Sequence, residues 1–176
     1  MAAVSLTRAE LFAVLLRAAR GVGVPLGHAE DLAHAVSDHG DANAIATASS
    51  ALDRGWAPPR FEQDEGLSFA HARAIAALPI ALDALQSGMP WVKLLDLDEP
   101  ALAPAYLDRA AASQTGEFVM EGDTIVAGSR TAYSLRDRPE VSAAYWDKLT
   151  QLAARTYVPA TDASRQGAGA GSIDND

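Results

Sequence analysis

Cysteine is missing from this sequence of 176 residues. A chain without thiols has no disulfide scaffold, no cysteine nucleophile and no thiolate ligand for a metal ion or an iron–sulfur cluster. Long apolar runs are missing too, since the longest uncharged apolar stretch, residues 74–82, contains Pro79 and is too short to cross a bilayer. Charged side chains between Arg8 and Arg20 interrupt the apolar region that a signal peptide would need. We therefore expect a cytoplasmic protein with no membrane partner.

Positive charge is scarce. The chain carries 14 basic and 23 acidic residues, for a net charge of -9, and residues 61–120 contain nine acidic and three basic ones. Nucleic-acid binding needs a basic stripe that neutralises phosphates, and no such stripe is present. The same acidic surface would repel anionic lipids. We therefore expect no nucleic-acid partner.

Familiar cofactor and nucleophile motifs are absent as well. The sequence has no P-loop, no G-x-G-x-x-G and no G-x-S-x-G. The glycines of residues 167–171 alternate with alanine and do not lie between a predicted strand and a predicted helix. We therefore expect no cofactor.

What the chain does contain suits a folded domain. Hydrophobic residues make up 49% of it, which is enough for a conventional core. A chain of this length buries roughly 70% of its unfolded surface, so it needs no metal ion to fold. We expect residues 1–155 to form a single domain.

The N-terminal third predicts three helices. Thr7 and Glu10 have the spacing of a capping box, and the apolar residues that follow recur at helical intervals up to Gly21. A second helix is predicted over 28–39, ended by Gly40. Either Asp41 or Asn43 can cap a third helix that ends at Gly55.

The rest of the chain predicts strands mixed with helices. Two prolines predict a loop over 56–67, and a helix interrupted or kinked at Pro79 is expected over 68–87. The later elements predicted are a strand over 91–97, a helix over 100–112, a hairpin over 117–127, a strand over 131–135 and a helix from about 137 to 155. The predicted fold class is α+β, with a helical N-terminal part packed with a small mixed or antiparallel sheet and further helices.

Three histidine-containing patterns are candidates for a metal site or a catalytic group. Glu30, His34 and Asp38 share one face of the second helix, but that face lies where solvent is expected, so we predict no metal site. In Asp38-His39-Gly40 the adjacent side chains point apart on a helix, which favours a histidine near the helix C-terminus over a catalytic pair. His28 follows a turn, and it could face a pocket as a proton carrier or simply cap a helix.

The C-terminal residues 156–176 lack periodicity and contain small residues that allow a close backbone approach. Composition alone favours a disordered terminus. The alternative is an extended tail that packs back on the domain, where arginine forks would bind a carboxylate and a phenol would orient it. The candidate ligand-binding residues are Arg130, Arg155, Tyr157, Ser164 and Arg165.

Two stretches of the chain resemble a known family. Residues 18–30 contain Ala18-Ala19-Arg20-Gly21 followed by Gly23-x-Pro25-x-Gly27-x-Ala29-Glu30, and residues 157–176 contain Tyr157-Val158-Pro159-Ala160, Ser164-Arg165 and Asp174-Asn175-Asp176. Both stretches resemble the bacterial family catalogued as domain of unknown function 3726. That label implies no activity, but the resemblance implies that the tail belongs to the domain.

A weaker similarity is to the malate/L-lactate dehydrogenase family that is unrelated to Rossmann enzymes. The Ser-His-Gly motif of that family would correspond to Asp38-His39-Gly40 here. The chain is shorter than such enzymes, and their nicotinamide-binding part has no counterpart in it.

Two functions remain open from the sequence, and whether the protein is an enzyme is not decided by it. The first is a small-molecule site for an anionic, carboxylate-bearing metabolite, lined by the C-terminal tail. The second is a non-catalytic accessory or dimerising protein whose tail docks on a partner, and a homodimer is compatible with either.

Overall fold

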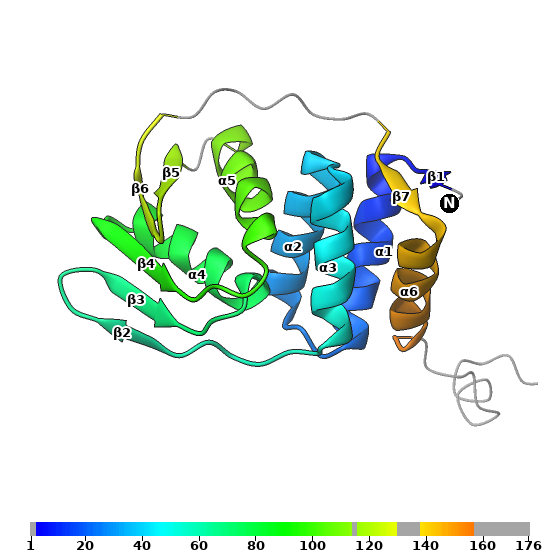
Figure 1. The fold of residues 1–176 in the computed structure, drawn as a ribbon, viewed down its shortest axis with the longest axis horizontal. Helices are drawn as coiled ribbons and strands as arrows, with labels where there is room; N and C mark the ends of the chain where they lie inside the picture. Colours follow the sequence, from blue (N-terminus) through cyan, green and yellow to red (C-terminus); the bar gives the residue numbers. More distant parts are fainter. Residues whose placement is uncertain (1–2, 114–115, 130–137, 157–176) are drawn as a thin grey trace, which may run out of the picture.

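The computed structural model describes residues 3–113, 116–129 and 138–156. The fold is of the α+β class, as predicted from the sequence (Figure 1). The helices are α1 (Arg8–Gly21), α2 (Leu26–His39), α3 (Ala42–Asp53), α4 (Ala74–Gln86), the short 3-10 helix η1 (Pro100–Leu102), α5 (Ala103–Ala112) and α6 (Ala143–Ala154). The strands are β1 (Ala3–Ser5), β2 (Phe61–Gln63), β3 (Leu67–Ala70), β4 (Trp91–Leu95), β5 (Phe118–Glu121), β6 (Thr124–Ala127) and β7 (Glu140–Ser142).

The molecule has two sides along its long axis, one mainly helical and one built on the larger sheet. On one side, α1, α2, α3 and α6 lie together with the small sheet of β1 and β7 (Figure 1). On the other side lies a five-stranded sheet in the order β2-β3-β4-β6-β5, with α4 and α5 packed against it. Helix α2 contacts both α4 and α5, so it joins the two sides.

The start of α1 confirms the predicted capping box. Thr7 N donates to Glu10 Oε2 at 2.8 Å, and Glu10 N donates to Thr7 Oγ1 at 3.2 Å. The hydrogen bonds that the backbone N and then the hydroxyl of Thr7 donate to Glu10 Oε2 lower the pKa of the Glu10 carboxyl. Asp41, and not Asn43, caps α3 by accepting hydrogen bonds from the first turn.

Residues 61–70 correct the prediction of a loop followed directly by a helix. They form an antiparallel hairpin of β2 and β3, in which Phe61 lies opposite Phe69. Leu67 and Phe69 are buried while Ser68 is less so, which is the alternation of a strand. Helix α4 therefore begins only at Ala74, and it continues through Pro79.

The last helix also begins later than predicted. Residues 140–142 form β7, which pairs with β1 at the other end of the chain, and Ser142 then caps α6. No local pattern signals such a pairing, because its partner is distant in sequence. The predicted strand over 131–135 lies outside the described residues. The strand at 91–97 and the hairpin at 117–127 are confirmed as β4 and as β5 with β6.

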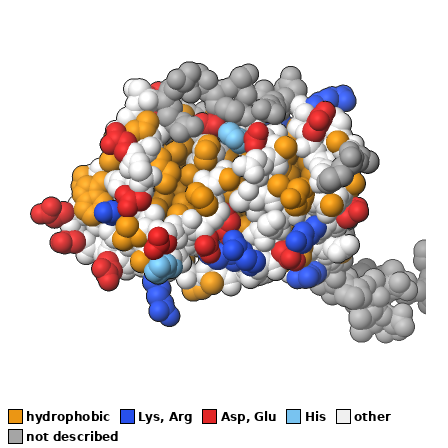
Figure 2. All heavy atoms as spheres, viewed as in Figure 1, with side chains coloured by type: hydrophobic (Ala, Val, Ile, Leu, Met, Phe, Trp, Pro, Cys, Tyr) orange, Lys and Arg blue, Asp and Glu red, His pale blue; other side chains and the backbone are white. Residues whose placement is uncertain are grey.

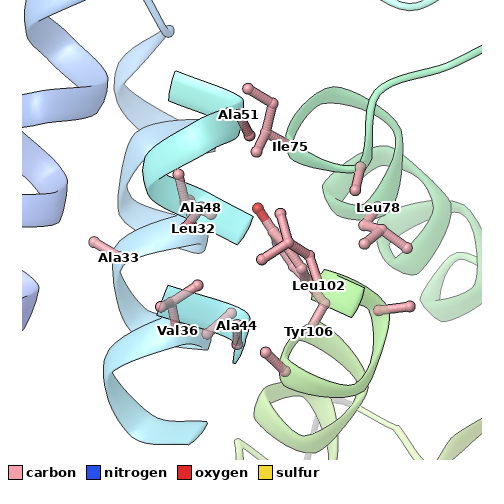
Figure 3. Packing of buried hydrophobic residues seen from close by; sticks show 14 of the residues in the cluster. Leu32, Ala33, Val36, Ala44, Ala48, Ala51, Ile75, Leu78, Leu102 and Tyr106 are labelled. Carbon is pink, nitrogen blue, oxygen red and sulfur yellow. The ribbon is translucent and has the colours of Figure 1, made fainter. Parts of the chain in front are cut away.

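Among the described residues, the core between α2, α3, α4 and α5 contains one phenol. Tyr106 of α5 lies among Leu32, Ala48, Ile75 and Leu102 (Figure 3), and its hydroxyl is buried without a hydrogen-bond partner among the described residues. Burial raises the pKa of this hydroxyl well above its usual value. A buried hydroxyl without a partner is a cost to the folded state.

Removing that hydroxyl should not weaken the fold. We expect Tyr106→Phe to leave the free energy of unfolding unchanged or to raise it by about 1 kcal/mol, measured by urea denaturation. Tyr145→Phe, at a half-buried tyrosine elsewhere, is the control. A loss of stability in Tyr106→Phe alone would mean that the hydroxyl is hydrogen-bonded, for instance to a buried water.

Candidate functional site

Two parallel strands end side by side in the five-stranded sheet. Strands β3 and β4 run parallel, with Ala70 opposite Leu95, and α4 forms the crossover between them. The loop after β3 leads into α4, and the loop after β4 leads through η1 into α5. In sheets with such crossovers, ligands bind outside the carboxyl ends of the strands. The carboxyl ends of β3 and β4 are therefore the candidate location for a binding site; we call this end of the sheet the carboxyl edge.

Both loops contain residues in the left-handed region of backbone space. His71 has a φ of 50°, Asp96 of 51° and Glu99 of 57°, and among the described residues these are the non-glycine positions with positive φ. Such conformations cost roughly 1–2 kcal/mol, less for Asp and His, and they persist only where the surroundings fix them. All three residues follow the carboxyl ends of β3 and β4.

The two loops are fixed to each other by backbone hydrogen bonds. His71 N donates to Leu95 O at 3.0 Å, and Asp98 N donates to Ala72 O at 3.0 Å. Ala74 N donates to Asp98 O at 3.1 Å. The parallel pairing of β3 and β4 thus continues beyond the strands, which holds the two loops in register.

A buried ion pair joins these two loops. Arg73 Nη2 and Glu99 Oε1 are 3.2 Å apart, and the Arg73 guanidinium also donates to the backbone carbonyls of Ala51 and Gly55 at the end of α3. The other carboxylate oxygen of Glu99 accepts a hydrogen bond from Ala74 N at 3.0 Å, at the start of α4. Because these groups bond one another, Arg73 and Glu99 hold the two loops against α3 and α4. Their side chains are therefore not available to a ligand.

A hollow of about 810 Å³ opens beside these two loops. Its walls come from residues 57–62, from 68–73, and from Leu95 and Asp98. The exposed large hydrophobic side chains of the described residues are Leu26, Phe61 and Leu95, and the last two line this hollow at 51% and 39% exposure. Apolar side chains that stay exposed beside a hollow are typical of binding surfaces. We call this hollow the carboxyl-edge pocket.

Polar groups face the same pocket. His71 lines the pocket, and its Nδ1 lies 3.5 Å from Oδ2 of Asp96, which is not part of the pocket lining; both side chains are exposed. Arg60 lines the pocket and has no ion pair among the described residues, whereas Asp98 lies 3.9 Å from Arg54 Nη1. Figure 2 shows acidic, basic and histidine side chains along the lower edge of the molecule, close to apolar ones. The pocket can therefore offer hydrogen-bond donors beside an apolar wall.

The residues predicted from the sequence are not gathered at this pocket. His28, in the first turn of α2, is half-buried, its ring centroid lies 5.0 Å from that of Trp56, and its Nε2 is buried without a partner among the described residues. Arg155 is exposed at the end of α6. The other candidates, Arg130, Tyr157, Ser164 and Arg165, and with them the predicted packing of the tail, lie outside the described residues. These assignments stay predictions.

The tripeptide Asp38-His39-Gly40 is held by α5. His39 Nδ1 lies 2.9 Å from Asp108 Oδ2, and Asp38 Oδ2 lies 3.2 Å from Arg109 Nη1, so two neighbouring residues of α2 pair with two neighbouring residues of α5. Asp38 and His39 thus point to different partners, as adjacent residues on a helix must. Gly40 ends α2 in the left-handed conformation.

The polar face of α2 has no metal-binding arrangement in the described part of the chain. Within it, no three imidazole or carboxylate side chains are gathered as a metal ion would require. The His34 ring packs on Phe12, with 4.5 Å between the ring centroids, and Asp38 pairs with Arg109. Glu30 is exposed.

A smaller hollow of about 250 Å³ lies between α2, α4 and α5, and Asp31 and Asp83 line it. Desolvation, and then the negative charge of Asp83, raises the pKa of the Asp31 carboxyl. The folded state therefore binds a proton at Asp31 more tightly than the unfolded state does. Its ionised form costs stability above the folded pKa, and this cost disappears as the pH falls below the unfolded pKa.

We expect Asp31→Asn to be more stable than the wild type at pH 7 by roughly 0.5 kcal/mol, a small value because the side chain is partly solvated. The difference should vanish near pH 3. Urea denaturation at both pH values measures it, with Asp64→Asn on the exposed hairpin as the control. An advantage that persists unchanged at low pH would contradict the electrostatic cause.

The sequence reasoning missed Arg60, Phe61, His71 and Leu95. A strand alternation at 67–70 was the available signal, but the alanine-rich stretch that follows favoured an earlier helix. If β3 had been recognised in the sequence, the carboxyl ends of β3 and β4 would have indicated the position of the pocket.

Within residues 3–113, 116–129 and 138–156, no helix is both long enough and apolar enough to traverse a membrane. Comparison with known proteins leaves the site to be judged from its own geometry. The chain matches no family model, no curated protein sequence and no solved structure.

Proposed function

We propose that the protein binds a small, carboxylate-bearing metabolite in the carboxyl-edge pocket. The observation that carries the proposal is the exposure of Phe61, at the start of β2, and of Leu95, at the end of β4, beside the loops after β3 and β4 that hold His71 and Asp96 in left-handed conformations. Exposed apolar groups and locally strained residues are both typical of functional sites, and here they coincide. The ligand class is the one predicted from the sequence. The proposed binding site is different, because the sequence predicted a site lined by the C-terminal tail.

The donors at the pocket support an anionic ligand group. Arg60 can form two parallel hydrogen bonds with a carboxylate, and the His71 imidazole can donate a further one. The acidic residues at the pocket, Glu62 and Asp98, oppose a free anion. Arg54 lies near Asp98 and reduces its effect. We therefore expect modest affinity, with the carboxylate placed at the side of Arg60 and His71.

A thermal-shift and titration experiment tests the site. Succinate, cyclohexylacetate and phenylacetate are the probes, and we expect at least one of them to raise the melting temperature of the wild type. Arg60→Gln should weaken that binding roughly tenfold, because a charge-assisted hydrogen-bond pair is lost. Arg155→Gln, which removes a charge from the end of α6, should leave it unchanged.

The same two variants separate the pocket from the tail site. If Arg155→Gln weakens binding and Arg60→Gln does not, the ligand binds where the sequence predicted it. If no carboxylate binds at all, the proposed function is wrong. The accessory or dimerising function and the family resemblance stay predictions, and light scattering on the full chain measures the oligomeric state.

A further inference from the structure

The apolar wall of the carboxyl-edge pocket is aromatic. Phe61 begins β2, and Phe69 lies directly opposite it on β3, with ring centroids 5.6 Å apart and ring planes inclined by 56°. Phe69 is fully buried, so it supports Phe61 from the core side, while about half of the Phe61 side chain is exposed. An exposed ring held by a buried one is a fixed surface, and a ligand that covers it loses little side-chain entropy.

Charged and aromatic groups are neighbours at this end of the hairpin. Because β2 and β3 are antiparallel, the start of β2 lies beside the end of β3. Arg60 precedes Phe61 directly, and His71 follows β3, so two hydrogen-bond donors lie at the same end as the exposed ring. Leu95 closes the side toward β4.

From this arrangement we infer that the preferred ligands are small aromatic carboxylates, with the ring on Phe61 and the carboxylate at Arg60 and His71. The inference rests on the proposed function and narrows its ligand class. Aromatic rings prefer tilted or offset contacts with one another, and such a contact strengthens binding beyond the area it buries. The gain over a saturated ring of the same size is about two- to tenfold in affinity.

Three probes that differ in one feature each test the inference by calorimetric titration of the full chain. Phenylacetate has the ring and the charge, cyclohexylacetate has the charge with a saturated ring, and 2-phenylethanol has the ring without the charge. We expect phenylacetate to bind about two- to tenfold more tightly than cyclohexylacetate. The alcohol should bind more weakly than both carboxylates.

A matched pair of variants locates the effect. Phe61→Leu keeps an apolar side chain at an exposed position, so the fold should persist, and it should abolish the preference for the aromatic ring. Leu26→Ala changes a side chain of similar exposure that does not line the pocket, and it should leave all three affinities unchanged.

The outcomes test the aromatic preference separately from the proposed function on which it rests. If cyclohexylacetate binds as tightly as phenylacetate, or if Phe61→Leu keeps the aromatic preference, the inference is wrong and the proposed function stands. If neither phenylacetate nor cyclohexylacetate binds, the inference is wrong, and if succinate does not bind either, the proposed function itself fails.

Discussion

Replacing Glu99 by glutamine should lower the free energy of unfolding by about 2–3 kcal/mol. The Glu99 side chain is 4% exposed, and its two oxygens accept hydrogen bonds from Arg73, Arg54 and Ala74 N. Glutamine has one acceptor oxygen, so its amide group would face either the guanidinium groups or the first turn of α4. The junction of α3, α4 and the loop after β4 would then contain a buried arginine without its counter-charge.

Asp98 provides the control for Glu99, because it is the preceding residue and lies near the same Arg54. Its side chain is 56% exposed, and Asp98 Oδ2 lies 3.9 Å from Arg54 Nη1. Exposed pairs of this kind contribute little, so Asp98→Asn should change stability by less than about 0.5 kcal/mol. Urea denaturation of both variants measures the difference. Equal losses of stability in the two variants would mean that the buried Glu99 carboxylate does not stabilise the loops after β3 and β4 more than an exposed one does.

A methyl group at Gly21 should separate α1 from α6. A Cβ atom built at this position would lie 2.1 Å from the backbone oxygen of Leu152 and 3.3 Å from Cβ of Arg155. The nearest atom belongs to the α6 backbone, so the contact cannot be relieved by a rotating side chain. We expect Gly21→Ala to lower the free energy of unfolding by about 2–3 kcal/mol, through displacement of α6.

Gly27→Ala is the matched control for Gly21. Gly27 lies in the first turn of α2, and a Cβ atom there would meet nothing within 4 Å. Alanine favours helix over glycine by up to about 1 kcal/mol, so this variant should be as stable as the wild type or more stable. Chemical denaturation compares the two, and a Gly21→Ala protein with wild-type stability would show that α6 can move away without cost.

Short-range patterns made the regular part of the fold predictable. The capping box at Thr7 and Glu10, the helical repeat of α2 and the Gly-Asp turn between β5 and β6 each act within a few residues. Their physical causes, which are hydrogen bonds to free N–H groups and burial of one face, can be recognised in a short window of sequence.

Pairings across the chain were not predictable in the same way. Strand β7 exists because β1 lies beside it, and both strands are too short to show an alternation of their own. Strand β3 was hidden because it is followed at once by the alanine-rich start of α4. A distant partner decides the local structure at β7, and β3 pairs with the distant β4 as well as with the adjacent β2.

The candidate site depends even more on distant partners. His71 and Asp96 are 25 positions apart, and only the parallel register of β3 and β4 brings them together. The left-handed backbone of both residues is likewise imposed by the loops, because Asp and His tolerate this conformation better than most residues but do not require it. The same holds for His39, whose partner Asp108 comes from another helix.

The most direct test of the proposed site is a map of ligand-induced amide chemical shifts. The isotope-labelled full chain is titrated with phenylacetate and with cyclohexylacetate. Binding at the carboxyl-edge pocket predicts that the largest shifts occur at Phe61, His71 and Leu95, and that Arg60→Gln reduces them. Shifts that gather at Arg155 and the end of α6, or no shifts with either carboxylate, would contradict a binding site at the ends of β3 and β4.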